Sequence, residues 1–199
     1  MKNMIKLFPV FLLVASLGFG QNNGPMEISP TSENLTINLQ QSTIKIMGTS
    51  TLHDWTSIAE QTEANIIFNN YNDVEIEKLV LVVEVESIKN TKGHGLMDKL
   101  TRKALKSDDF PKINYVFIKA ETISDQENEL TVKLTGNLTI AGKTNKITVL
   151  TTINKSSTNV VLKGIHKLKM TDYGVKPPKA LLGTVKTGDE ITIDFSIKF

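Results

Sequence analysis

The sequence predicts an all-β protein whose antiparallel strands share one buried face and close into a barrel or a sandwich. The last nine residues alternate strictly between apolar and polar side chains, which is the pattern of a strand with one buried and one wet face. The same alternation recurs around Leu134 and around Leu162. One segment, 95–106, has a helical period instead. We therefore expect long strands with one amphipathic helix between them.

Residues 1–20 are expected to be a cleaved secretory signal peptide and not part of the fold. Lys2 and Lys6 form a positive start, and the apolar run 7–17 is followed by small residues. This run is shorter than the roughly 20 apolar residues that a membrane-spanning helix needs. Residues 21–34 are rich in Pro, Gly, Ser and Thr, so we expect a flexible leader before the first strand.

The composition excludes several classes of protein. The chain has no cysteine, which excludes a lipoprotein anchor, a disulfide framework and catalysis by a thiol. Loss of Lys2 and Lys6 with the signal peptide lowers the 23 basic side chains to 21, equal to the 21 acidic ones. A mature net charge near zero points away from a nucleic-acid partner. The length of the mature chain suits one domain.

Nine segments carry the strand pattern, and turn residues separate them. Asn and Asp gather between strands at 69–73 and 125–128, and Gly142 allows a tight hairpin. The segment 79–83 is apolar on both faces, which indicates that it is covered outside as well as inside. The expected strands are 35–47, 51–57, 62–69, 74–87, 113–123, 129–141, 143–154, 159–170 and 190–199.

The helix predicted at 95–106 is amphipathic. Met97, Leu100 and Ala104 form an apolar stripe, which makes this helix the candidate cover for the outer face of 79–83. Its opposite face is either a solvated surface whose cations favour the C-terminal end of the helix, or a surface that meets a phosphate head group or an anionic membrane. The cations on that face are Lys99, Arg102, Lys103 and Lys106.

Strand alternation places two of the three histidines on apolar faces. His53 lies two residues from Trp55, so the two side chains are expected on one face of a strand. His166 lies on the face that carries Leu162 and Met170. Each histidine is either a hydrogen-bonded core residue or a polar contact for the head group of a ligand in the lumen. No third ligand lies at metal-binding spacing, so we expect no metal site.

No segment has the spacing of a catalytic or cofactor-binding motif. His53 and Asp54 are neighbours whose side chains point to opposite faces of a strand, and no serine lies in a nucleophile elbow. Paired carboxylates such as Glu75 and Glu77 are explained by solubility at the sheet surface. We therefore expect no catalytic residue, no cofactor and no enzyme activity.

Four segments, taken in order, resemble the YceI-like family. They are 48–55 (GTSTLHDW), the helix running into 108–113 (DDFPKI), 136–144 (GNLTIAGKT), and 172–174 (DYG) before 188–191 (GDEI). The resemblance implies that 35–199 form an extended lipocalin-like antiparallel β-barrel of about eight strands, with one amphipathic helix between strands. It also implies a periplasmic or secreted protein whose elongated apolar lumen binds a polyisoprenoid or another long-chain amphiphile. The segment 177–182 is longer and stiffer than the commoner family pattern, which bears on the shape of one barrel mouth.

On this resemblance, the expected function is to hold a polyisoprenoid, an isoprenoid quinone or a similar amphiphile as cargo, for sequestration or transport. The expected partner is that lipid, with a transient contact at a membrane surface and a homodimer as further candidates, and no nucleic acid. The cations of the helix are expected to approach the head group or the membrane. The residues expected to line the lumen are His53, Trp55, Leu138, Leu162, His166, Met170 and Phe195.

Three other functions fit the same pattern. A chain that ends in Phe after alternating apolar residues fits the last strand of a small outer-membrane barrel, although one Trp and three Tyr are few for two aromatic girdles. An enzyme that acts on an isoprenoid is a second alternative, and no catalytic set supports it. The third is a structural or stress-related barrel whose lumen is filled by side chains and holds no ligand.

Overall fold

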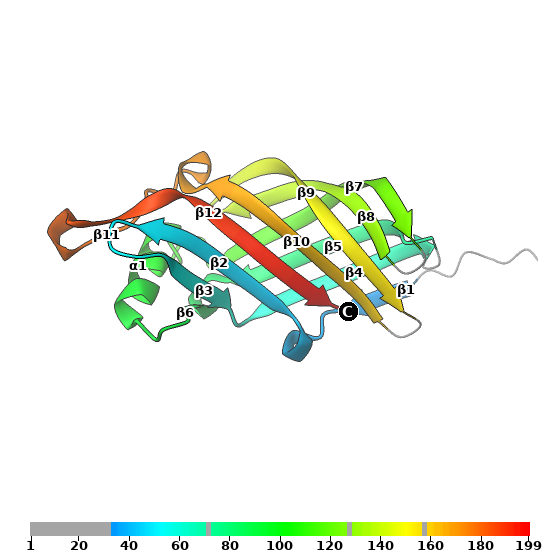
Figure 1. Ribbon diagram of the computed structural model, residues 1–199, viewed down its shortest axis with the longest axis horizontal. Helices are drawn as coiled ribbons and strands as arrows, with labels where there is room; N and C mark the ends of the chain where they lie inside the picture. Colours follow the sequence, from blue (N-terminus) through cyan, green and yellow to red (C-terminus); the bar gives the residue numbers. More distant parts are fainter. Residues whose placement is uncertain (1–32, 71–72, 127–128, 157–158) are drawn as a thin grey trace, which may run out of the picture.

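One antiparallel sheet curves round itself to form an elongated barrel (Figure 1). The predicted signal peptide, 1–20, lies outside the residues that the structure describes, as does most of the predicted leader, 21–34. The computed structural model describes residues 33–70, 73–126, 129–156 and 159–199.

Twelve strands and one α-helix make up this described part of the chain. The helix, α1 (Gly95–Leu105), lies between β6 and β7. In chain order the strands are β1 (Glu33–Thr36), β2 (Thr43–Ser50), β3 (Trp55–Ala59), β4 (Thr62–Asn70), β5 (Glu75–Glu84), β6 (Ile88–Asn90), β7 (Lys112–Gln126), β8 (Glu129–Ile140), β9 (Lys143–Ser156), β10 (Asn159–Lys169), β11 (Lys179–Ala180) and β12 (Val185–Lys198). The short 3₁₀ helices there are η1 (Leu39–Gln41), η2 (Val85–Ser87), η3 (Met170–Tyr173) and η4 (Leu181–Gly183).

The barrel has eight long segments, because three of them are bent and count as two strands each. β1 and β2 are the halves of one bent segment, as are β3 with β4 and β5 with β6. β1 pairs with β4, whereas β2 pairs with β3 and β12; β5 pairs with β4, whereas β6 pairs with β3. From β5 the ring continues through β7, β8, β9, β10 and β12 back to β2. The predicted antiparallel barrel with one helix between strands is therefore confirmed.

The strand predicted at 51–57 begins later than expected, at Trp55. The Ser50 hydroxyl accepts hydrogen bonds from the backbone N–H groups of Leu52 and His53, both at 3.2 Å, and donates to the His53 carbonyl at 2.7 Å. Bonds between a hydroxyl and the nearby backbone replace the sheet ladder with a turn. The prediction that His53 and Trp55 share a strand is therefore wrong.

Other strand predictions change at their bends and ends. The predicted strand 35–47 is divided by η1, and the predicted strand 74–87 ends early, at Glu84, where η2 follows. The last strand begins earlier than its alternation indicated, at Val185, and its pairing with β2 shifts register between Thr187 and Ile191. That irregularity obscures the period of two in the first part of β12.

One half of the barrel is filled by side chains. Ile66 and Phe68 of β4 are fully buried at its centre. The C-terminal end of the chain closes this half, because the backbone N–H of Phe199 donates to the Val160 carbonyl at 2.9 Å. The buried residues packed round this centre include Ile76, Leu130, Val132, Ile153 and Val160.

The helix α1 lies at the other end of the barrel, beside β6 and η2 (Figure 1). Its predicted apolar stripe of Met97, Leu100 and Ala104 is present, but the stripe faces the inside of the barrel. The prediction that the helix covers the outer face of 79–83 is therefore wrong. The 3₁₀ turn η2 and the short strand β6 carry the chain past the end of β5 before the helix begins, so the helix lies across the end of the barrel.

Candidate functional site

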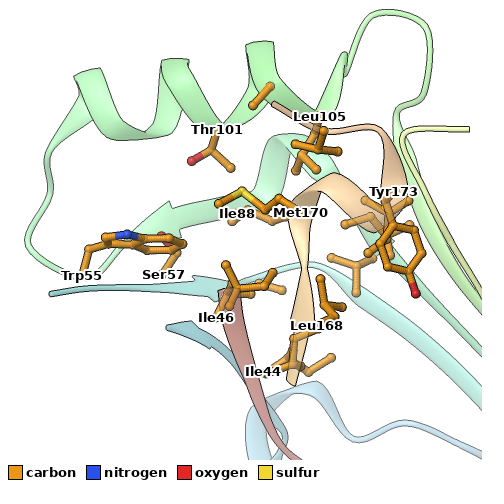
Figure 2. Close-up of a pocket in the computed structure, with 18 of the residues that line it drawn as sticks. Ile44, Ile46, Trp55, Ser57, Ile88, Thr101, Leu105, Leu168, Met170 and Tyr173 are labelled. Atoms are coloured by element: carbon orange, nitrogen blue, oxygen red, sulfur yellow. The ribbon is translucent and has the colours of Figure 1, made fainter. Parts of the chain in front are cut away.

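The half of the barrel next to α1 encloses a cavity of about 410 Å³ with an overwhelmingly apolar lining. Side chains of β2, β3, β5, β7, β8, β9, β10 and β12 supply the walls. The helix lies across the cavity, and Figure 2 shows Thr101 and Leu105 directed toward the side where Trp55 and Met170 lie. The volume falls within the range of ligand-binding pockets, about 300–1,000 Å³.

All seven residues predicted to face the lumen line this cavity. Leu138, Leu162 and Met170 are buried. Trp55, His166 and Phe195 are partly exposed within the cavity wall. His53 also contributes to the lining, but from the β2–β3 turn, where it is exposed and its Nδ1 lies 2.8 Å from the Asp54 carbonyl. Their role in binding a ligand stays a prediction.

Three aromatic rings lie flat against the cavity wall because glycines on neighbouring strands leave room for them. Each ring occupies the place that a side chain on its neighbour would need, so the glycines keep these rings out of the centre of the lumen. A Cβ atom would lie 2.3 Å from the Trp55 ring at Gly48, 2.4 Å from the Tyr115 ring at Gly136 and 2.6 Å from the Phe195 ring at Gly164.

Few polar groups reach the cavity. Burial lowers the pKa of His166 from 6.5, so its imidazole is neutral at pH 7 and one ring nitrogen can donate while the other accepts. Burial also raises the pKa of Tyr115 to about 12, which keeps its phenol protonated. Within the described residues the Tyr115 hydroxyl has no hydrogen-bond partner, although it is buried. Such a group is costly to bury and is a ready donor to a ligand.

Tyr115 is a cavity residue that the sequence reasoning missed. It lies in the predicted strand 113–123, whose alternation was too weak to assign an inner face. The register of β7 against β8 determines its inner face, because Tyr115 pairs with Leu138 and both residues line the cavity. The glycine at 136 was a usable signal, since glycine inside a strand often marks the close approach of another group.

The four cations predicted on the helix do not form one free surface. Lys99, Lys103 and Lys106 are exposed, as expected of a face turned away from the barrel. Arg102 is only partly exposed, and its Nε lies 3.2 Å from Glu86 Oε2. This ion pair links α1 to η2, so Arg102 has a structural partner that the helical period could not reveal. The predicted approach of these cations to a head group or membrane stays a prediction.

The helix, the β2–β3 turn and the β11–β12 connection lie at the same end of the barrel (Figure 1), and residues of all three line the mouth of the cavity. Leu96, Leu52 and Leu181 come from these three segments in turn, and each lines the cavity while remaining exposed. The cavity therefore reaches the surface between them. The predicted stiff segment 177–182 does shape this mouth, since Pro178, Lys179, Ala180 and Leu181 all contribute to its lining.

The described residues show neither a metal cluster nor a membrane-spanning helix. No group of three His, Asp or Glu side chains there is placed to hold a metal ion. No helix in the same part of the chain has the length and apolar character needed to cross a bilayer.

A closed antiparallel barrel with a helix at one end and an apolar cavity behind it defines a lipocalin-like class of fold. Residues 29–199 match the YceI-like domain, and the chain belongs to that family. The predicted family resemblance is therefore confirmed. No curated protein matches the sequence.

Several solved structures share the fold at low sequence identity. BcnA of Burkholderia cenocepacia is 16% identical with a TM-score of 0.66, over 82% of this chain and 99% of that one. A polyisoprenoid-binding domain of Saccharophagus degradans, implicated in plant cell wall breakdown, is 13% identical with a TM-score of 0.64, over 82% and 95%. The YceI protein of Campylobacter jejuni is 20% identical with a TM-score of 0.57, over 72% and 82%.

Proposed function

We propose that this protein is exported and holds the tail of a polyisoprenoid, an isoprenoid quinone or a similar long-chain amphiphile in its barrel. The observation that carries the proposal is the apolar cavity of about 410 Å³, which reaches the surface beside α1 while the opposite half of the barrel is filled. Water is poorly stabilised in such a space because few polar groups there can form hydrogen bonds with it. The binding of an isoprenoid or alkyl chain is favoured by about 0.8 kcal/mol of transfer free energy for each CH₂ that leaves water.

The shape of the cavity supports an elongated ligand. The lining extends from Leu181 at the mouth to Leu162, which belongs to the core that fills the other half. The aromatic rings of Trp55 and Phe195 lie against the walls, so the space between the strands stays open along this path. A flexible chain can enter from the mouth and end against the filled half.

The polar groups of the cavity supply limited specificity. The Tyr115 hydroxyl is a donor without a partner among the described residues, and His166 offers a neutral imidazole. Both suit a carbonyl or hydroxyl oxygen on the ligand, as a quinone or an isoprenoid alcohol provides. The Saccharophagus degradans domain, which shares this fold, is a polyisoprenoid-binding domain, and this supports the same ligand class.

Export is part of the proposal because residues 1–20 have the pattern of a secretory signal peptide. Cleavage at that point leaves a protein in the periplasm or outside the cell, where cargo moves between or away from membranes. N-terminal sequencing of protein recovered from the periplasm tests this. A mature chain that starts near Gln21 supports export, whereas uncleaved protein confined to the cytoplasm contradicts it.

The alternatives fit the observations less well. A side-chain-filled barrel would leave no cavity of this volume beside the helix. An outer-membrane barrel needs an apolar outer band, but the outward positions of β10 carry Lys163, Lys167 and Lys169. The cavity itself therefore favours an amphiphile-binding protein.

The test is mass spectrometry of organic extracts of the protein, expressed with its own signal in a Gram-negative host and purified without detergent. Leu138→Trp places a large ring in the cavity, whereas Leu150→Trp adds the same ring on the outer wall, where Leu150 is exposed. We expect a stoichiometric long-chain isoprenoid or quinone from the wild type and from Leu150→Trp, and much less from Leu138→Trp. Empty extracts of folded wild-type protein would contradict the proposal.

A further inference from the structure

The mouth of the cavity carries four exposed leucines on three separate segments. Leu52 is 67% exposed on the β2–β3 turn, and Leu96 is 60% exposed at the start of α1. Leu181 is 66% exposed and Leu182 is fully exposed on η4, between β11 and β12. Single exposed leucines are ordinary on a protein surface, but several at one end of the molecule mark an interaction site.

Hydrogen bonds of Thr51 hold two of these segments together. Its backbone N–H donates to the Lys186 carbonyl at 3.0 Å, and its hydroxyl donates to the Thr184 carbonyl at 3.3 Å. The same hydroxyl accepts from the backbone N–H of Lys186 at 3.1 Å. The turn that carries Leu52 and the turn that carries Leu181 are therefore fixed side by side and present one surface.

The backbone of η4 exposes its leucines in an unfavourable conformation. The φ angles of Leu181 and Leu182 are 48° and 54°, in the left-handed region that glycine and asparagine prefer. Little burial compensates for two successive left-handed leucines, because Leu181 stays 66% exposed at the edge of the cavity and Leu182 is fully exposed. Backbone strain of this kind clusters at functional sites.

Two exposed lysines lie in the β11–β12 hairpin that carries Leu181 and Leu182. Lys179 of β11 lies opposite Lys186 of β12 in the register of the hairpin, and both are exposed. Like charges placed directly opposite each other on neighbouring strands are unfavourable unless an anion lies between or above them. Lys176 adds a third positive charge, and the sequence from 176 to 188 contains no acidic residue. In a bilayer the acyl chains lie below the phosphates. Exposed leucines next to paired lysines match these two layers, since the leucines can reach the acyl chains while the lysines contact the phosphates.

We propose that the mouth of the barrel docks on the surface of an anionic lipid bilayer. The side chains of Leu52, Leu96, Leu181 and Leu182 enter the boundary of head groups and acyl chains. Lys179 and Lys186 contact lipid phosphates. A protruding tip with leucines on three segments fits a fluid lipid surface better than the groove-and-knob shape of a protein partner. The docked orientation directs the cavity opening toward the membrane, which extends the proposed function without depending on the identity of the cargo.

The test is flotation of the full-length mature protein with vesicles of phosphatidylethanolamine and phosphatidylglycerol, and with neutral phosphatidylcholine vesicles. Leu181→Ser/Leu182→Ser is expected to lower the partition coefficient at least about tenfold on both vesicle types. The matched control is Leu150→Ser, which replaces a leucine that is 57% exposed on β9. This control is expected to bind like the wild type. Equal binding by the tip variant and the wild type would overturn the proposal, as would an equal loss in the Leu150→Ser control.

The charge of the tip is tested separately. Lys179→Gln/Lys186→Gln is expected to weaken binding to the anionic vesicles roughly 25-fold at low salt, at about fivefold for each lysine near the surface. Binding to neutral vesicles should not change. The control, Lys133→Gln/Lys163→Gln, removes two lysines from the outer wall and is expected to have little effect. If the two double variants weaken binding equally, the net charge of the protein attracts it to the vesicles and the lysines of the mouth have no special role. The docking assignment then fails.

Depth of insertion gives a readout that does not depend on affinity. The chain has no cysteine, so Leu182→Cys and Leu150→Cys each provide one labelling site for an environment-sensitive fluorophore. Lipids brominated on their acyl chains are expected to quench the label at 182 and leave the label at 150 unchanged. Because this measurement uses protein extracted free of cargo, it separates docking from the cavity's function. Absence of quenching at 182 in vesicle-bound protein would overturn the proposed orientation.

Discussion

Gly136 is the position at which a single methyl group is expected to narrow the cavity. A Cβ there would lie 2.4 Å from the Tyr115 ring, whereas ordinary contacts begin at 3.4 Å. In Gly136→Ala the ring must therefore move about 1 Å away from Gly136, and because Tyr115 lines the cavity we expect it to move into the lumen. No hydrogen bond from the Tyr115 hydroxyl to the described residues opposes this movement.

The displaced ring removes space for roughly one or two CH₂ groups of the bound tail. At about 0.8 kcal/mol for each CH₂, the affinity should fall roughly 4- to 15-fold. The overpacked wall should also lower the free energy of unfolding by about 1–3 kcal/mol. Trp55 is the single tryptophan of the chain and lines the cavity, so quenching of its fluorescence by an isoprenoid quinone measures the binding.

Two further variants make this prediction refutable. Gly95→Ala adds the same methyl group where nothing lies within 4 Å, and it should leave the affinity unchanged. Gly136→Ala/Tyr115→Val removes the displaced ring together with its hydroxyl, so it should bind the quinone as tightly as Tyr115→Val alone. If Gly136→Ala binds the quinone as tightly as the wild type while remaining folded, the ring does not border the ligand and the assignment of the cavity is wrong.

Three other changes test separate parts of the structure. The pKa of His166 is lower in the folded protein than its usual value. Below about pH 6.5 the unfolded chain therefore binds more protons at this histidine than the folded protein does. The free energy of unfolding should therefore decrease in that range, and His166→Phe should flatten this dependence; a steeper slope would contradict the assigned burial. Tyr115→Phe removes a buried hydroxyl that has no partner among the described residues, so denaturant unfolding of cargo-free protein should show unchanged stability or a gain of about 1–3 kcal/mol; a loss would reveal a hidden bond. Phe68→Ala should cost about 3–5 kcal/mol in the filled half and leave quinone affinity unchanged in the folded protein, whereas a large loss of affinity would show that the two halves are coupled.

Much of the barrel could be predicted from the sequence because the alternation of buried and exposed residues survives in the long strands. In β8, inward residues from Leu130 to Ile140 alternate with outward ones without interruption. The same regularity predicted the inner face of β10 and the lining residues Leu162, His166 and Met170. Because one face of each strand packs on the core, the period of two fixes which side chains can face the lumen.

The features that the sequence did not reveal depend on side chain–backbone bonds and on contacts between distant segments. The Ser50 hydroxyl ends β2 in a turn, which moved His53 from the predicted strand to the rim of the cavity. The position of Tyr115 against Gly136 depends on the register of two strands that no local pattern specifies. The ion pair of Arg102 with Glu86 required the placement of η2 beside the helix.

A crystal structure of the detergent-free protein, purified with its cargo, tests the central claim most directly. We predict continuous elongated density that runs from the mouth beside Leu181, past Leu138, to Leu162. A polar end of the ligand is expected within hydrogen-bond distance of Tyr115 or His166. Inward movement of Trp55, Tyr115 and Phe195 to fill the space with no ligand present would contradict the account.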